Sequence, residues 1–231
     1  AERERTNAEL EAFSYSVSHD LRAPLRAIEG FANALREDYG SQLDATAHEY
    51  LSQVMGASSR MNRLVRDLLE YGRMSRMEMV PQRVPVKALA QRLLDESFLG
   101  QGVQVLGADS ITVLAHEPTL AQILMNLTSN AIKFHRPGCG PQVSIAIERT
   151  SHSTARITVK DCGIGIAPQH LDRIFRVFER LHGVEEYPGT GIGLAIVKRG
   201  CERMGGTCGV ESTLGQGSSF WVELPEAGQL A

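Results

Sequence analysis

Apolar residues recur at steps of three and four along the first third of the chain. The first run consists of Leu10, Phe13, Val17, Leu21, Ile28 and Leu35, and the second of Tyr50, Val54, Ala57, Met61, Leu64, Leu68 and Tyr71. This spacing is typical of helices that pack along one seam of a bundle. Between the runs, Gly40 can end one helix and Asp44 can cap the next. The pattern predicts an antiparallel hairpin of two long helices.

Such a hairpin leaves a large apolar seam without a partner. Two helices of about 35 residues are not expected to be stable alone, and pairing with a second copy completes a four-helix bundle. A homodimer is therefore expected. The alternative is that the hairpin folds back on the second half of the same chain.

The pattern changes near residue 80. Pro81 and Pro85 forbid a continuing helix, so residues 81–85 are expected to form a linker. Beyond it, helical and strand-like patterns alternate, which indicates an α/β sandwich. The predicted helices are 86–98, 118–134 and 192–204, and the predicted strands are 103–106, 111–114, 143–147, 155–159, 208–212 and 219–224. The chain is thus expected to be multidomain, with a helical domain at 1–80 and an α/β domain at 86–231.

The composition of the chain excludes some classes of binding partner. The net charge of -3 and the scattered basic residues give no reason to expect nucleic acid. No apolar run is long enough to span a membrane, and no signal-peptide pattern is present, so we expect a cytoplasmic fragment without membrane contact. The charged helical start without methionine indicates a piece of a longer protein. The four cysteines lack CxxC or zinc-type spacing, so we expect reduced thiols and no redox dithiol.

Three polar residues share one face of the predicted helix 118–134. Asn126, Asn130 and Lys133 lie on adjoining turns of that face. Amide oxygens can ligate Mg²⁺ while a lysine attracts the same polyphosphate. The alternative is an ordinary solvated helix face.

A second candidate follows the predicted strand 155–159. Asp161 can accept the exocyclic amine of adenine, and Gly163 and Gly165 allow close approach of the backbone. The alternative is a plain turn at the end of a strand.

A third candidate opens the predicted helix 192–204, whose N-terminal amides suit a phosphate. Its residues are Gly189, Thr190, Gly191, Gly193 and Leu194. The polar, lid-like segment 180–188 precedes it where a dinucleotide fold would have a strand. A last glycine turn, 215–217, fits either a simple turn or part of the same pocket.

Taken together, these segments resemble the ATP-binding domain of the histidine kinase branch of the superfamily that includes gyrase-type topoisomerases and MutL. The NxxxNAxKF signature of that branch corresponds to residues 126–134, DxGxGI to 161–166, FxxFxR to 175–180 and GTGIGL to 189–194. The resemblance implies that ATP and Mg²⁺ are the cofactors.

The resemblance also implies a role for each candidate residue. Asn130 would be the principal Mg²⁺ ligand with Asn126 beside it, and Asp161 would recognise adenine. Lys133 and the backbone of 191–194 would hold phosphates.

Two aromatic residues in the third signature carry a further expectation. Phe175 and Phe178 would pack the base of an ATP lid. Ordinary core packing is the alternative, and the more common role for at least one of them.

The first helix carries a separate signature. Residues 13–25, FSYSVSHDLRAPL, resemble the histidine kinase acceptor box FxxxxSHELRTPL. A neutral imidazole, with an ordinary pKa of about 6.5, is a competent nucleophile near pH 7. The resemblance implies that His19 accepts the phosphoryl group and that Asp20 is its general base. Pro24, one turn on, would allow the helix to bend.

One position departs from the family pattern. The family often has threonine or asparagine four residues after the histidine, where it orients the water that dephosphorylates a response regulator; here that residue is Ala23. Because alanine offers no hydrogen bond to water, weak phosphatase activity is expected.

The whole resemblance implies a sensor histidine kinase of a two-component system, most like kinases attached to phytochrome-like or PAS-type sensors. Its expected partners are a second copy, the receiver domain of a response regulator and an upstream sensor domain. Two alternatives remain open at this point: a degenerate kinase that acts as a scaffold, and an ATPase of the same superfamily that does not use His19.

Overall fold

The computed structural model describes residues 2–150, 153–181, 183 and 186–228, with the backbone alone for 2–20, 75 and 76. The chain divides into two compact units, Ala1–Arg76 and Met77–Ala231.

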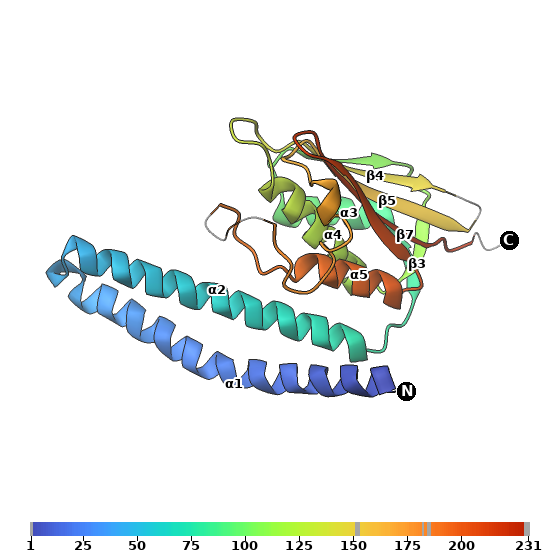
Figure 1. The fold of residues 1–231 in the computed structure, drawn as a ribbon. Coiled ribbons are helices and arrows are strands. Elements are labelled where there is room, and N and C mark those ends of the chain that lie inside the picture. Colours follow the sequence, from blue (N-terminus) through green and yellow to red (C-terminus); the bar gives the residue numbers. More distant parts are fainter. Residues whose placement is uncertain (1, 151–152, 182, 184–185, 229–231) are drawn as a thin grey trace. The chain divides into compact units, whose positions relative to one another are not determined.

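The first unit is a helical hairpin (Figure 1). Helix α1 spans Glu2–Tyr39, a 3-10 turn η1 spans Gly40–Gln42, and helix α2 spans Ala45–Arg76. The predicted cap is present, because the backbone N–H of Ala47 donates to Asp44 Oδ1 at 2.8 Å. His48 Nε2 lies 3.0 Å from the Gly40 carbonyl oxygen and closes the same turn. The prediction of two long helices is confirmed.

A small internal core fixes how the two helices pair. Leu25 of α1 packs with Val65 and Leu69 of α2. The buried hydroxyl of Ser58 donates to the Leu25 carbonyl oxygen at 3.3 Å, which adds a polar contact between the helices. Helix α1 continues through Pro24, one residue before this contact.

The hairpin does not bury all of its apolar side chains. Phe31 is 74% exposed and Tyr50 is 63% exposed. Among the side chains of the two helices that the structure describes, the other large apolar ones that remain exposed are Leu21, Ile28, Leu35, Tyr39, Val54 and Met61. The hairpin therefore presents an apolar surface that another molecule can cover.

The second unit is a layer of three helices packed on a five-stranded sheet (Figure 1). The helices are α3 (Val86–Ser97), α4 (Glu117–Lys133) and α5 (Gly193–Arg203). The sheet has the order β2-β4-β5-β7-β6, with β2 and β4 parallel and the other pairs antiparallel. Its strands are β2 (Val103–Gly107), β4 (Val143–Arg149), β5 (Thr154–Asp161), β6 (Thr207–Thr213) and β7 (Gly217–Pro225). The predicted α/β domain is confirmed.

Alternation along the strands separates the two faces of this sheet. In β5, Ala155, Ile157 and Val159 are buried among apolar residues of α4 such as Leu124 and Leu127. These inward side chains form the core of the unit.

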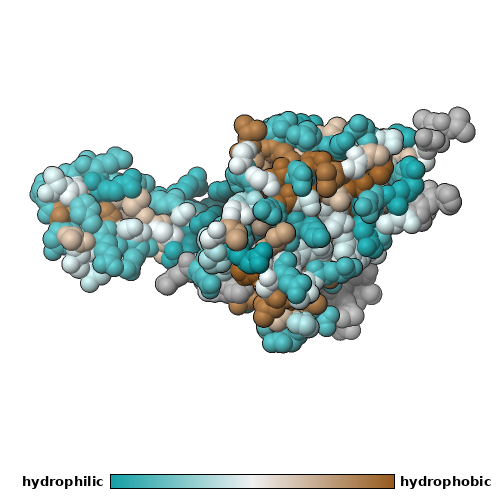
Figure 2. Space-filling model, turned by 90° about the horizontal axis from the view of Figure 1, so that it is seen from above, coloured by the Kyte–Doolittle hydropathy of each residue, from teal (hydrophilic) through white to brown (hydrophobic). Residues whose placement is uncertain are grey.

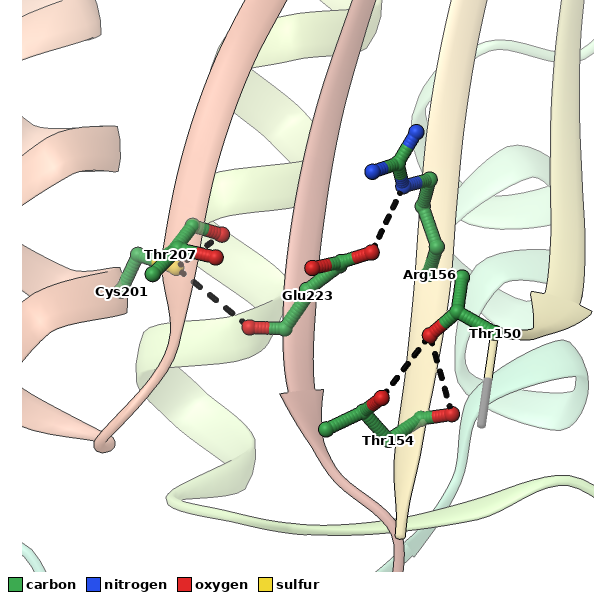
Figure 3. Close-up of polar contacts among 6 residues, drawn as sticks. All are labelled: Thr150, Thr154, Arg156, Cys201, Thr207 and Glu223. Atoms are coloured by element: carbon green, nitrogen blue, oxygen red, sulfur yellow. Dashed lines mark hydrogen bonds and ion pairs between the residues drawn. The ribbon is translucent and has the colours of Figure 1, made fainter. Parts of the chain in front are cut away.

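The opposite face of the sheet is polar. Arg156 lies over the Trp221 ring at 4.4 Å and donates from Nε to Glu223 at 2.9 Å (Figure 3). Glycine at position 209 leaves room for the Trp221 ring, since a Cβ on Gly209 would come within 2.4 Å of the indole.

Part of the expected linker is instead a strand. Residues Gln82–Pro85 form β1, which pairs antiparallel with β3 (Thr112–Ala115) in a separate two-stranded sheet. Val84 of β1 is fully buried. The prolines are compatible with this pairing because Pro81 precedes the strand and Pro85 ends it. Tertiary pairing therefore decided the conformation of this segment.

The surface of the chain carries both polar and apolar residues. In the view of Figure 2, polar residues (teal) surround separate apolar patches (brown). Among the helices that the structure describes, none is long and apolar enough to cross a membrane.

Candidate nucleotide site

The candidate site of the second unit is built around the C-terminal half of α4. The turn after β5 lies against the end of this helix, since the Ile164 N–H donates to the Phe134 carbonyl oxygen at 3.0 Å. The turn between β6 and β7 joins it, because the Gly215 N–H donates to the Ile164 carbonyl oxygen at 2.7 Å. Segments far apart in the sequence thus meet at one place.

Asp161 is the buried acid at this junction. Its side chain is only 6% exposed, and Oδ1 accepts the backbone N–H groups of Gly163 at 2.8 Å and Ser218 at 3.1 Å. Burial raises the pKa of Asp161, and the two amide hydrogen bonds oppose that rise. Within the described residues, Oδ2 has no hydrogen-bond partner. This oxygen is therefore left to accept a hydrogen bond from a ligand.

Glycines surround Asp161 because side chains have no room there. A Cβ on Gly163 would lie 2.3 Å from the Phe134 carbonyl oxygen, and one on Gly217 would lie 2.2 Å from the Asp161 carbonyl oxygen. Gly165 has a φ of +69°, and a Cβ on it would lie 2.1 Å from the Thr213 carbonyl oxygen. These glycines let protein backbone segments pass close together, whereas the close approach of a nucleotide to Gly163 and Gly165 stays a prediction.

One face of α4 lies against the glycine loop that precedes α5. A Cβ on Gly193 would come within 3.1 Å of Asn126 Oδ1, and one on Gly189 within 3.0 Å of Lys133 Nζ. The Nδ2 atom of Asn126 is buried and has no hydrogen-bond partner in the described part of the chain. A buried donor without a partner costs free energy unless a ligand accepts from it. This face therefore fits an anionic group.

Lys133 also favours an anion at this face of α4. Its Nζ lies 4.1 Å from the centre of the Phe134 ring, and among the described residues no carboxylate pairs with it. Burial, and secondly the positive charge of Arg180, lower the pKa of Lys133 to about 8. Two cationic groups near each other without an anion are an unfavourable arrangement that a polyphosphate would relieve.

Arg180 organises the segment before the glycine loop. Its Nη1 donates to the Gly189 carbonyl oxygen at 2.7 Å and its Nη2 to the Tyr187 carbonyl oxygen at 3.1 Å. The Tyr187 ring in turn lies 5.0 Å from the Phe134 ring. Residues 182, 184 and 185 of the expected lid lie outside the described residues. The described part of that segment is tied to the end of α4.

The two aromatic residues of the third signature have different places. Phe175 packs into the core, edge-on to Phe220 at 6.4 Å. Phe178 is 58% exposed and has a φ of 65°, with its N–H donating to the Gly191 carbonyl oxygen at 3.0 Å. The structure thus leaves the Phe178 side chain largely exposed, and its expected place at the base of a lid stays a prediction, since part of that lid lies outside the described residues.

The remaining predicted residues complete the loop and helix around these contacts. Asn130 is half-buried on the same helix as Asn126 and Lys133, and its carbonyl oxygen accepts the Phe134 N–H. Thr190 Oγ1 accepts the Ile192 N–H at 3.4 Å, and Gly191 has a φ of +75°. Leu194 packs against the core.

The acceptor box lies in the other unit. His19 and Asp20 are part of α1, but their side chains lie outside the described ones. Ala23 is exposed.

Two hydrogen bonds at the site could not be predicted from the sequence. The last glycine turn lies beside Asp161, because the Ser218 N–H that follows it donates to Asp161 Oδ1 at 3.1 Å, so a role for residues 215–217 at the nucleotide site stays a prediction. Arg136 donates from Nε to the Cys162 carbonyl oxygen at 2.9 Å and so ties the loop after α4 to the Asp161 turn. Their polar residue types alone do not show which distant carbonyl or carboxylate they reach.

The two units match two family models. Residues 9–76 match the His Kinase A (phospho-acceptor) domain, and residues 115–228 match the histidine kinase-, DNA gyrase B-, and HSP90-like ATPase family. The chain belongs to the sensor histidine kinases. Its second unit is the ATP-binding domain of this family, and its first unit is the phospho-acceptor domain.

Similar proteins agree with this assignment. The kinase core is 40% identical to cyanobacterial phytochrome A of Nostoc over 98% of this chain, and 33% identical to the sensor protein GacS of Pseudomonas syringae over 92%. The chain spans 30% of the length of the first relative and 24% of the second.

Solved structures show the same arrangement of elements. Full-length ShkA in complex with AMPPNP is 30% identical, with a TM-score of 0.71 over 96% of this chain and 47% of that one. The Acinetobacter baumannii histidine kinase AdeS has a TM-score of 0.61 at 22% identity, covering 91% of this chain and 98% of that one, and supports the fold alone.

The Asp161 geometry predicts the effect of Asp161→Asn on ATP binding. The variant amide oxygen can still accept from Gly163 and Ser218, so the fold should persist. Its NH₂ group would then replace the free Oδ2 and face the adenine amine as a second donor. We expect a loss of roughly 1.5–3 kcal/mol in ATP binding, measured by calorimetry. Asp95→Asn, at an exposed acid of α3, is the matched control, and equal affinities for both variants would contradict the role of Asp161.

The lowered pKa of Lys133 predicts a pH dependence of ATP affinity. A polyphosphate favours the protonated amine, so the pKa of Lys133 should be higher in the complex than in the free protein, where it is about 8. Affinity should be constant at lower pH and fall as pH rises through 8, by at most about tenfold per unit. Lys133→Arg should make the profile flat, because guanidinium stays charged. An identical fall in the variant would assign the effect to another group.

Proposed function

We propose that this chain is the core of an ATP-dependent protein histidine kinase that phosphorylates its own His19 and then transfers the phosphoryl group to an aspartate of a response regulator. The observation that carries this proposal is that one chain holds both the acceptor box in α1 and, in the second unit, a buried acid, Asp161, near Lys133, with which no carboxylate among the described residues pairs.

The two units would divide the work. Residues 1–80 would form the dimerisation and phosphotransfer domain, and residues 86–231 the ATP-binding domain. Strand β1 would belong with the latter, because it pairs with β3. The connection between the two domains would then shorten to Pro81.

The ATP-binding domain would hold ATP by its two ends. Asp161 would accept the adenine amine, with Gly163 and Gly165 allowing the base to approach. Lys133 and the backbone of 191–194 would hold the phosphates. That the similar protein ShkA was solved in complex with AMPPNP supports binding of a nucleotide. Amide oxygens such as those of Asn130 and Asn126 fit Mg²⁺, which would neutralise phosphate charge.

The transfer step would need few groups from the protein. One ring nitrogen of His19 would attack the γ-phosphorus, forming an N–P bond as the P–O bond to ADP breaks. Asp20 would accept the proton from the other ring nitrogen. Most of the rate enhancement would come from positioning and from the charge of Lys133.

His19→Gln tests the assignment of the nucleophile. We expect the variant to lose all labelling from γ-labelled ATP in the presence of Mg²⁺, while its ATP affinity stays near that of the wild type, since the two lie in different units. The label on the wild type should be labile in acid and stable in base. Persistent labelling of the variant would refute the role of His19, and ATP turnover without phosphoprotein would favour the simple ATPase.

A homodimer would cover the apolar surface of the hairpin, as the phospho-acceptor family match supports. Phe31, 74% exposed on α1, would lie in that interface with Ile28 and Leu35. Phe31→Glu would place a charge there, and desolvating it would oppose association.

Sedimentation of the full chain measures this association. We expect the wild type to be a dimer and Phe31→Glu to be a monomer at the same concentration. Arg26→Glu is the control, because a turn of about 100° per residue places it opposite Ile28 and Leu35. A monomeric, folded wild type would contradict the dimer.

The same proposal assigns a receiver domain as the recipient of the phosphoryl group and an upstream domain, of the phytochrome-like or PAS type, as the source of the signal. Similarity to a cyanobacterial phytochrome supports the second assignment.

Ala23 predicts a weak phosphatase. Ala23→Thr should raise dephosphorylation of the phosphorylated regulator and change autophosphorylation little, because His19 does not need that hydroxyl to attack ATP. The cost to the helix should be below about 1 kcal/mol at this exposed position. Both half-reactions and the dimer fraction should be measured on one sample. A weakened dimer would assign Ala23 to packing, and strong phosphatase activity in the wild type would contradict the prediction.

A further inference from the structure

Two of the four cysteines lie together in the second unit, although nothing in their spacing indicated a pair. Cys201 is fully buried near the end of α5, and Cys208 is half-buried on β6. Both side chains contribute to the apolar core between the helices and the sheet. The expectation of reduced thiols agrees with the structure, in which both are free, but their proximity was not expected from the spacing.

The turn at residues 204–207 brings the two sulfur atoms together. Cys201 Sγ lies 3.0 Å from the carbonyl oxygen of Thr207, the residue before Cys208, and 3.9 Å from that of Glu223 (Figure 3). The Cys201 thiol also hydrogen-bonds the Cys208 side chain. A Cβ on Gly206 would come within 3.1 Å of Cys201 Sγ, so glycine is needed for the chain to turn this tightly.

The two thiols are not equivalent. The hydrogen bond from Cys201 lowers the pKa of Cys208, and Lys198 acts in the same direction against the opposing effects of burial and Glu202. The same hydrogen bond, together with burial, raises the pKa of Cys201. Cys208 is thus the better nucleophile, because the thiolate is the reactive form.

Access also favours Cys208. Strand β6 is at the edge of the sheet, next to β7 alone. A small oxidant can approach a half-buried side chain on an edge strand, whereas Cys201 is enclosed. Cys201 is correspondingly placed to react second, with an oxidised Cys208.

We propose that Cys201 and Cys208 form a redox-sensitive dithiol that a peroxide converts to a disulfide, and that this disulfide weakens nucleotide binding. The Cys208 thiolate attacks hydrogen peroxide, takes one oxygen as the S–O bond forms and the O–O bond breaks, and with one proton gives sulfenic acid and water. The Cys201 thiol then displaces water from that sulfur as the S–S bond forms. Peroxide is reduced and the two thiols lose two electrons.

The link to the nucleotide follows from α5 and rests on the proposed function. A disulfide holds its two sulfur atoms at about 2.05 Å with a fixed geometry, so it would tie the end of α5 covalently to β6. Helix α5 begins at Gly193, which packs against Asn126. Two residues earlier, a Cβ on Gly191 would lie 2.9 Å from the Glu179 carbonyl oxygen, so the loop before the helix is tightly packed. A loop with so little space is displaced when its helix moves.

The test uses the full chain carrying Cys139→Ser and Cys162→Ser, which removes the two exposed thiols. After hydrogen peroxide and alkylation, digestion without reductant should yield a cross-linked pair of peptides containing Cys201 and Cys208, about 2 Da lighter than the two free thiols. Dithiothreitol should reverse it. Adding Cys208→Ser should abolish the bridge, and Cys208→Val serves the same purpose if serine disturbs folding.

ATP affinity is measured on the same oxidised and reduced samples. We expect a several-fold weaker affinity after oxidation, recovered on reduction, and no peroxide effect in the Cys208 variant. Oxidation of Cys208 to sulfinic acid with Cys201 still alkylated would overturn the disulfide. A complete bridge with unchanged affinity would overturn its coupling to the nucleotide. Failure of the reduced chain to bind ATP would instead contradict the proposed function, because the bridge is detected by mass alone.

Discussion

The burial of the Asp161 carboxylate is the constraint on which much of the second unit depends, because a buried carboxylate needs hydrogen-bond partners. Two backbone N–H groups, from Gly163 and Ser218, satisfy Oδ1. They come from the turn after β5 and from the start of β7, so both segments must pass within hydrogen-bond distance of one side chain. The glycines at 163, 165 and 217 are the consequence, since a Cβ at each would meet a backbone carbonyl oxygen.

Helix α4 supplies polar side chains to the other half of the candidate site. Its buried positions anchor it to the sheet, while Asn126 and Lys133 on another face lie against the glycine loop. Asn126 Nδ2 has no hydrogen-bond partner among the described residues, and the pKa of Lys133 is lowered to about 8. Both features cost free energy, and an anion bound at this face would offset that cost.

The spacing of residue types along the chain was sufficient to predict the helices and strands and to select the candidate site residues. Periodicity gave the hairpin, the cap at Asp44 and the helices and strands from residue 86 onward, because these depend on neighbours in the sequence. Contacts between distant segments were not accessible in that way. Strand β1 forms in a proline-flanked segment because β3 pairs with it, the Phe178 N–H is bonded to the distant Gly191 carbonyl oxygen, and a tight turn brings Cys201 near Cys208.

The central claim is that the ATP-binding domain and the acceptor helix of this chain serve one reaction. The most direct measurement is to locate the phosphate after the full chain is incubated with ATP and Mg²⁺, by peptide mapping under neutral or alkaline conditions that preserve phosphohistidine. The account predicts phosphate on His19. Phosphate on another residue, or ATP consumption with no phosphate on the protein, would contradict it.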